Sequence, residues 1–363
     1  MLIELIQVAI GNRKNLSHSL SAKEWWKLYD EAMKQAVAGV CFAGVEKLPK
    51  EQWPPQNLLF EWIGMTEQIK QGNAVVDKQT AEMWKQLKKE GLDAAILKGQ
   101  GIATLYDSLQ LTVDSLQLGA LRQSGDIDIW VLGGYQKVCD YVQRTHPTKD
   151  VAYHRFHYDV FPDTEVELHH RPTLMRNLLD DRKLARWYNS FKAEDFVYLE
   201  DKGFAVPPAS FNVIFILTHI YRHFLFEGIG LRQVMDYYFV LKNSHTDDTD
   251  NTDILKTLRA LRLEKFAGAM MWVLHEAFGL EEEMMICPMD EKEGRFVLNE
   301  ILLTGNFGQA DARYRYKRLF KLRHHISHGS HLLMHYPSEV IWTPIWLIYH
   351  RWWKWVHKLR IEN

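Results

Sequence analysis

The chain has 363 residues, of which 47% are hydrophobic, 25% charged and 12% aromatic. This composition is that of a globular protein and excludes collagen-like, low-complexity and wholly disordered chains. The net charge of −2 favours no particular charged partner, and three widely spaced cysteines with no CxxC pair predict neither a disulfide framework nor a thiolate zinc site.

The first part of the chain, residues 1–90, has the pattern of amphipathic helices. Ser21 and Glu24 have the spacing of a capping box, in which each side chain accepts a hydrogen bond from a free amide of the first turn. Pro54-Pro55 interrupts the chain, and residues 58–89 are long enough for a second, longer helix. We expect a helical N-terminal region.

The middle part, residues 91–205, mixes short strands with short helices. Residues 94–97 are an apolar run before a glycine turn, 126–131 alternate between polar and apolar residues, and 135–144 suit a helix. Residues 151–161 and 164–169 have the pattern of a strand pair around Pro162-Asp163. From Pro207-Pro208 onward, residues 206–363 are again predicted to be helical. The order predicts an α+β fold with a mixed-sheet core between two helical regions.

Two aspartates on one predicted strand carry the first chemical signal. Asp126 and Asp128 are two residues apart, so a strand places both carboxylates on one face while Ile127 and Ile129 enter the core. Two adjacent carboxylates repel each other, which favours a divalent cation between them. Oxygen ligands of this kind suit Mg²⁺. The alternative is a half-exposed strand whose outer face carries two aspartates.

Two neighbouring segments strengthen the metal hypothesis. Lys98 lies in a glycine turn after a predicted strand, where backbone amides and its charge could approach a triphosphate. The alternating strand 165–169 places Glu165, Glu167 and His169 on one face and offers a third carboxylate. Spacing alone does not choose between the two glutamates. Three carboxylates can hold two Mg²⁺ ions around the phosphates of a nucleotide.

The segments ILKGQGIATLY (96–106), RQSGDIDIWV (122–131) and VELHHRP (166–172) resemble the nucleotidyltransferase fold of the DNA polymerase β superfamily. They are most similar to a bacterial family of uncharacterised nucleotidyltransferases. The resemblance is specific over about 98–171 and looser at GIGLRQVMD (228–236) and GNFG (305–308). It implies that Asp126, Asp128 and Glu167 are the catalytic, metal-binding carboxylates, and that nucleotide contacts come from Lys98, Gly99, Gln100, Arg122, Gly125 and Arg232.

The sequence departs from that superfamily in two places. Gln100 replaces the serine that follows the turn glycine, so a hydroxyl contact to the nucleotide is missing and Lys98 must compensate. The segment between Tyr106 and Arg122 is lengthened by a duplicated DSLQL, at 107–111 and 114–118. This insertion could act as a lid or obstruct the site.

The resemblance predicts transfer of a nucleoside monophosphate from an NTP to an acceptor hydroxyl, on a small molecule or a protein side chain, with two Mg²⁺ ions. The alternative is a catalytically weak nucleotide-binding or interaction module that keeps the fold. The chain start lacks the basic segment of a signal peptide, and the apolar run 341–349 is about half a bilayer span and contains Pro344. We therefore expect a cytoplasmic protein with no membrane contact.

Three further features have competing interpretations. His219 and His223 have the i, i+4 spacing of a zinc pair, but bracing the site is favoured because no third ligand is evident. Arg232 is either paired with Asp236 on a helix surface or directed at a nucleotide phosphate. Residues 311–363 hold ten lysines and arginines against three acids, interleaved with tryptophans. A C-terminal helix docked on the body is favoured there over nucleic-acid binding.

Overall fold

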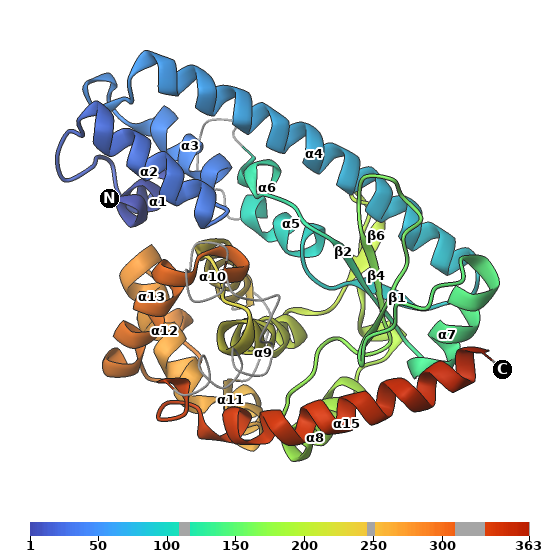
Figure 1. The fold of residues 1–363 in the computed structure, drawn as a ribbon. Helices are drawn as coiled ribbons and strands as arrows, with labels where there is room; N and C mark the ends of the chain where they lie inside the picture. Colours follow the sequence, from blue (N-terminus) through green and yellow to red (C-terminus); the bar gives the residue numbers. More distant parts are fainter. Residues whose placement is uncertain (109–116, 245–250, 309–330, 363) are drawn as a thin grey trace.

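The computed structural model describes residues 1–108, 117–244, 251–308 and 331–362 (Figure 1). The architecture is mostly helical α+β around a mixed four-stranded sheet, which confirms the predicted fold class. The second DSLQL copy lies largely outside the described residues, as does most of the first, so the proposed lid is not described.

Four helices form the N-terminal part: α1 (Leu2–Ala9), α2 (Ala22–Lys34), α3 (Ala38–Lys47) and α4 (Gln56–Lys89), with a 3₁₀ turn at Lys50–Gln52. The predicted capping box starts α2, where the Ser21 side chain accepts from the Glu24 amide and the Glu24 side chain accepts from the Ser21 amide. Helix α4 runs along one edge of the molecule, from the other N-terminal helices to the sheet (Figure 1).

The sheet has the order β1-β2-β4-β3, formed by β1 (Ala94–Ile96), β2 (Ile127–Val131), β3 (Arg155–His157) and β4 (Val166–His169). Strands β2 and β4 are parallel, whereas the two outer pairs are antiparallel. Along the chain, α5 (Gln100–Ser108) and α6 (Leu118–Leu121) connect β1 to β2, and α7 (Gly134–Thr145) follows β2. Helix α8 (Leu178–Tyr188), a 3₁₀ turn at Ala193–Asp195 and the hairpin β5 (Val197–Leu199) and β6 (Phe204–Val206) follow.

The described C-terminal part is helical: α9 (Ala209–Phe226), α10 (Leu231–Ser244), α11 (Asn251–Ala260), α12 (Glu264–Phe278), α13 (Glu291–Thr304) and α15 (Pro337–Glu362). Short 3₁₀ turns lie at Glu282–Met284 and Asn306–Gly308. Helix α15 runs along the lower margin of the molecule in the view of Figure 1 and ends beside α7. No helix in the described ranges has both the length and the apolar content to cross a membrane.

The two faces of the sheet belong to different hydrophobic cores. Ile127 and Ile129 of β2 and Leu168 of β4 face a core shared with α4, α7 and α15. On the opposite face, Trp130 stacks on Phe211 of α9, with ring centroids 5.1 Å apart. That second core joins the N-terminal and C-terminal helices. The boundaries proposed near residues 90 and 205 stay predictions, because the two cores are each built from more than one of those regions.

Candidate active site

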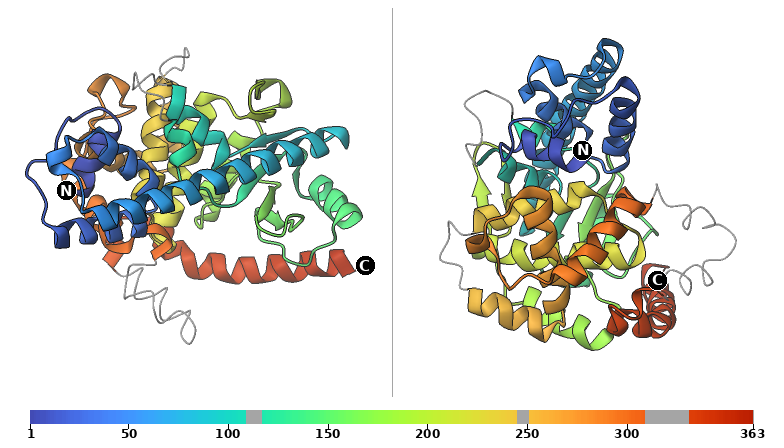
Figure 2. Two further views of the ribbon diagram at one scale, coloured as in Figure 1. Left: turned by 90° about the horizontal axis from the view of Figure 1, so that it is seen from above. Right: turned by 90° about the vertical axis from the view of Figure 1, so that its left-hand side faces the viewer.

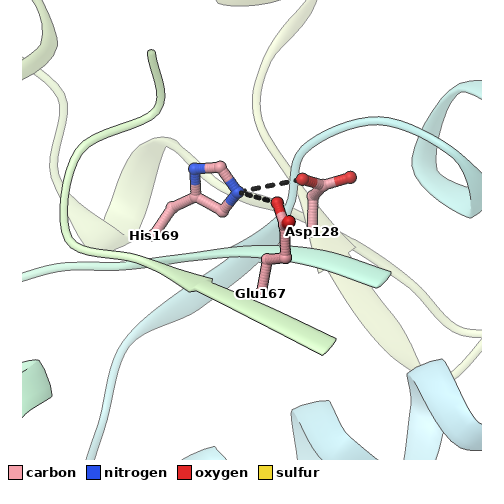
Figure 3. A group of neighbouring side chains, drawn as sticks. All are labelled: Asp128, Glu167 and His169. Carbon is pink, nitrogen blue, oxygen red and sulfur yellow. Dashed lines mark hydrogen bonds and ion pairs between the residues drawn. The ribbon is translucent and has the colours of Figure 1, made fainter. Parts of the chain in front are cut away.

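The parallel pairing of β2 and β4 creates the centre of the site. The register sets Asp128 directly opposite Glu167, on the sheet face that α9 covers. His169 follows two residues later on the same face of β4. The ligand atoms of these three residues all lie within 4.8 Å of one another, and they form the one such group found among the described residues (Figure 3).

Asp128, Glu167 and His169 form a buried polar cluster. His169 Nε2 lies 2.9 Å from Asp128 Oδ1 and 3.3 Å from Glu167 Oε2 (Figure 3). Burial lowers the pKa of His169, but the hydrogen bonds to both carboxylates outweigh burial, so its pKa is raised. This shift favours the protonated ring, whose Nε2 forms a hydrogen bond with Asp128 and lies close to Glu167 Oε2.

Two cations close the cluster from its outer side. Lys98 Nζ lies 3.0 Å from Asp128 Oδ2, and Arg155 Nη1 of β3 lies 2.7 Å from Glu167 Oε2. Burial raises the pKa of Asp128, but Lys98 and His169 outweigh that effect and hold it well below its usual range. Lys98 and Arg155 are partly exposed, whereas the carboxylates are almost fully buried. Asp128 is thus held in its ionised form, and each carboxylate has a cation within ion-pair distance.

The glycine turn between β1 and α5 positions Lys98. Gly99 has φ +59°, a left-handed conformation that favours glycine, and an added Cβ would lie 3.4 Å from the Asp126 carbonyl oxygen. The side-chain amide of Gln100 donates a hydrogen bond to Asp77 of α4. Gln100 is therefore held by α4, and its predicted contact with a nucleotide stays a prediction.

Asp126 lies just before β2 and is half-buried. It is outside the group formed by Asp128, Glu167 and His169, so the predicted convergence holds for Asp128 and Glu167 and does not include Asp126. Glu165 precedes β4 and is exposed, which favours Glu167 as the second carboxylate. A metal-binding role for Asp126 stays a prediction.

Two arginines, Arg122 buried and Arg232 partly buried, hold the loop that leads to Asp126. The Arg122 guanidinium donates two hydrogen bonds to the Asp236 carboxylate of α10, from Nε to Oδ1 at 2.6 Å and from Nη2 to Oδ2 at 2.7 Å. Arg232 does not pair with Asp236; its Nη1 donates to the Gln123 carbonyl at 2.8 Å. Their sequence-based assignment to nucleotide contacts stays a prediction, because each guanidinium already has a protein partner.

Gly125 lies in the same loop. A Cβ added there would be 3.9 Å from Arg232 Nη1, an ordinary contact distance, so this glycine leaves space beside the guanidinium. Burial lowers the pKa of Arg232 to about 10, with the Arg122 charge acting in the same direction and Asp236 and Asp126 opposing it. Arg232 and the Arg122–Asp236 pair together link α10 to the loop carrying Asp126.

Helix α9 adds further charged groups beside the cluster. His223 Nδ1 lies 2.7 Å from Glu227, which also pairs with Arg222 at 3.2 Å. Burial lowers the pKa of Arg222, whereas Glu227, Glu167 and Asp128 oppose that shift. The rings of His219 and His223 lie 4.3 Å apart, but the described residues supply no third ligand that would complete a zinc site. Bracing of the site remains the favoured interpretation.

The structure also includes residues that the sequence reasoning missed. Arg155 was not singled out, although the turn proposed at Pro162-Asp163 predicts that it lies close to His169 across a hairpin. Glu227 was missed despite its i, i+4 spacing from His223 on α9. His169 was placed on the correct face, but its contact with Asp128 depends on the parallel neighbour strand.

Comparison with known proteins agrees with this geometry. A family model described as uncharacterised nucleotidyltransferase matches residues 21–279, more than half of the chain. The matched range contains the sheet, the glycine turn, α9 and α10. No curated protein and no solved structure matches the chain. The chain therefore belongs to the family of uncharacterised nucleotidyltransferases, which is named for an enzyme class.

Proposed function

We propose that the protein transfers a nucleoside monophosphate from an NTP to an acceptor hydroxyl in a Mg²⁺-dependent reaction. The observation that carries the proposal is the pairing of Asp128 with Glu167 across two parallel strands, beside a glycine turn that presents Lys98. The acceptor oxygen forms a bond to the α-phosphorus, the bond between that phosphorus and the bridging oxygen breaks, and pyrophosphate leaves. The hydroxyl proton passes to water.

The donor set supports a magnesium site. Asp128 and Glu167 provide carboxylate oxygens within 4.8 Å of each other, and such oxygens are the ligands that Mg²⁺ prefers. Asp126, half-buried just before β2, is the carboxylate that we assign to the second ion. When bound, Mg²⁺ would stabilise the negative charge on the phosphates. His169 would then position the two carboxylates from the buried side.

The cations around the carboxylates have a second task in this proposal. In the structure, Lys98 and Arg155 neutralise Asp128 and Glu167. A divalent cation placed between the carboxylates would take over that neutralisation and repel both side chains. Because each is partly exposed, each is free to turn outward and bind phosphate oxygens. We therefore assign the phosphate contacts to Lys98 and Arg155.

The test compares NTPs labelled at the α- and γ-phosphates, incubated with Mg²⁺ and a mixture of small-molecule and protein hydroxyl acceptors. The proposal predicts that label from the α-phosphate enters a product and label from the γ-phosphate is released in pyrophosphate. Asp128→Asn should abolish transfer, whereas Asp140→Asn, an exposed aspartate on α7, should leave it unchanged. Transfer of the γ-label would contradict the proposal.

A nucleotide-binding module without catalysis is the competing function. Its support is that Lys98, Arg155 and His169 already contact both carboxylates in the structure, so that no metal ion is needed to balance them. Such a module would bind NTP equally well with Mg²⁺ and with a chelator, and it would incorporate neither label. That pair of results would replace our proposal with the module.

A further inference from the structure

Helix α15 has two faces of opposite character. On its inner face, the Glu339 carboxylate accepts hydrogen bonds from the backbone amides of Arg176, at 2.7 Å, and Asn177, at 3.1 Å. Trp346 and Trp353 are buried on the same side. Trp353 also makes edge contacts with Tyr153 at 5.4 Å between ring centroids. The helix is thus fixed to the body, and its outer face is presented in one orientation.

The outer face is a continuous apolar stripe. Its five members recur at intervals of four and three residues, which places them along one side of a helix. They are Ile341 at 60% exposed, Ile345 at 49%, Ile348 at 71%, Trp352 at 56% and Trp355 at 63%. Soluble monomers rarely expose large apolar side chains in a contiguous row, and such rows mark binding surfaces. We call these five residues the outer stripe.

The charged side chains of α15 between Glu339 and Glu362 are all lysine or arginine. Arg351 and Lys354 are exposed next to Trp352 and Trp355, and no aspartate or glutamate occurs between Glu339 and Glu362. Helix α15 lies along the margin of the molecule, and seen end-on it occupies a corner (Figure 2). A flat surface could therefore approach the outer stripe over several turns.

We propose that α15 binds an anionic lipid surface, lying parallel to it with the outer stripe in the boundary between headgroups and acyl chains. An amphipathic helix with isoleucine and tryptophan on one face and lysine and arginine beside them has the chemistry that such a surface recognises. Tryptophan favours the headgroup level, and each basic side chain near anionic lipids adds attraction. No bilayer-spanning segment is required, so the inference departs from the sequence expectation of no membrane contact.

Two other occupants fit the observations less well. A second copy packed on the outer stripe would place four cations, Arg351 and Lys354 of each chain, at the margin of one interface without an acidic partner from either helix, which opposes association. Nucleic acid would suit the cations and the tryptophans, but Ile341, Ile345 and Ile348 cannot stack on bases. Aliphatic and basic side chains together favour lipid.

The experiment is vesicle flotation with the full chain. Vesicles contain either phosphatidylcholine alone or equal parts of phosphatidylcholine and phosphatidylglycerol. We expect binding to the mixed vesicles, weaker binding at high salt and little binding to phosphatidylcholine alone. The variant Ile348→Ser/Trp352→Ser/Trp355→Ser should lower the partition coefficient at least about tenfold. Phe60→Ser, which changes a 62% exposed apolar residue on α4, should bind as the unaltered chain does.

Thermal unfolding provides the folding control, because the three substituted side chains are exposed and the triple variant should keep its Tm. Equal flotation of the triple variant and the unaltered chain would overturn the proposal. So would a dimer in the absence of vesicles that the triple variant abolishes, which would assign the outer stripe to a second copy. Oligonucleotide binding lost in the triple variant, with no flotation, would assign it to nucleic acid.

Discussion

The buried pair of Arg122 and Asp236 offers the most quantitative test of how the site is built. Asp236 accepts three hydrogen bonds: two from the Arg122 guanidinium, at 2.6 and 2.7 Å, and one from the Tyr106 hydroxyl at 2.7 Å. All three residues are almost fully buried. In Asp236→Ala, the guanidinium would remain buried with no counter-charge and the hydroxyl would lose its acceptor.

The size of the effect follows from these contacts. Leaving one member of a buried ion pair without its partner costs about 3–5 kcal/mol, and an unpaired buried hydroxyl adds about 1 kcal/mol. We therefore expect Asp236→Ala to lower the free energy of unfolding by about 4–6 kcal/mol. Replacing both partners, in Arg122→Met/Asp236→Leu, removes the uncompensated charge and should recover most of that loss.

Urea unfolding at pH 7, followed by tryptophan fluorescence, measures both variants against the unaltered chain. The Arg122 carbonyl accepts a hydrogen bond from Asn73 of α4 at 2.8 Å, so the double variant keeps one anchor of the loop that leads to Asp126. The reasoning would be refuted if Asp236→Ala cost less than about 1 kcal/mol. It would also fail if the double variant were as unstable as the single one.

Two further predictions concern stability. Burial, reinforced by the charges of Lys354 and Arg176, lowers the pKa of His350 to about 4, so the folded state favours the neutral ring. The neutral ring makes its full contribution to the free energy of unfolding above the ordinary pKa near 6.5, and this contribution is lost as the pH falls toward 4. Phenylalanine has no such titration, so the free energy of unfolding of His350→Phe should rise relative to that of the unaltered chain as the pH falls from 6.5 to 4. Because the ring is only half-buried, we expect a difference of about 1–2 kcal/mol. Urea unfolding across this pH range measures it, and parallel curves of stability against pH would contradict the prediction. Gly99→Ala should lower the free energy of unfolding by about 1 kcal/mol, because Gly99 has a positive φ. Gly64→Ala, at a position in α4 where an added Cβ meets no other atom, should leave the stability unchanged or raise it. Equal effects of the two substitutions in urea unfolding would show that the turn at Gly99 imposes no strain.

Local patterns in the sequence were sufficient to predict the main elements. The spacing of Ser21 and Glu24 predicted the start of α2, and the alternation around Asp128 predicted β2 and the inward direction of its isoleucines. The turn at Pro162-Asp163 predicted the antiparallel pairing of β3 with β4. Each of these features depends on residues close together in the chain, where backbone geometry fixes which side chains share a face.

Contacts between distant segments could not be predicted in this way. Arg122 and Asp236 are 114 residues apart, whereas the helical spacing of Arg232 and Asp236 suggested that those two residues could pair instead. The alternation of Asp126 and Asp128 also placed both carboxylates together, but β2 begins at Ile127, so only Asp128 is held on the sheet opposite Glu167. Tertiary packing determines which distant residues pair, and the local spacing of residues in the sequence does not predict that packing.

The central claim is that Asp128 and Glu167 hold Mg²⁺ for an NTP, and isothermal titration tests it most directly. The account predicts that the unaltered chain binds NTP tightly only when Mg²⁺ is present. Asp128→Asn and Glu167→Gln should each bind NTP weakly, with or without Mg²⁺. Glu165→Gln, a change in an exposed carboxylate two residues from Glu167, should titrate as the unaltered chain does. Tight Mg²⁺-dependent binding that survives in either Asp128→Asn or Glu167→Gln would contradict the account.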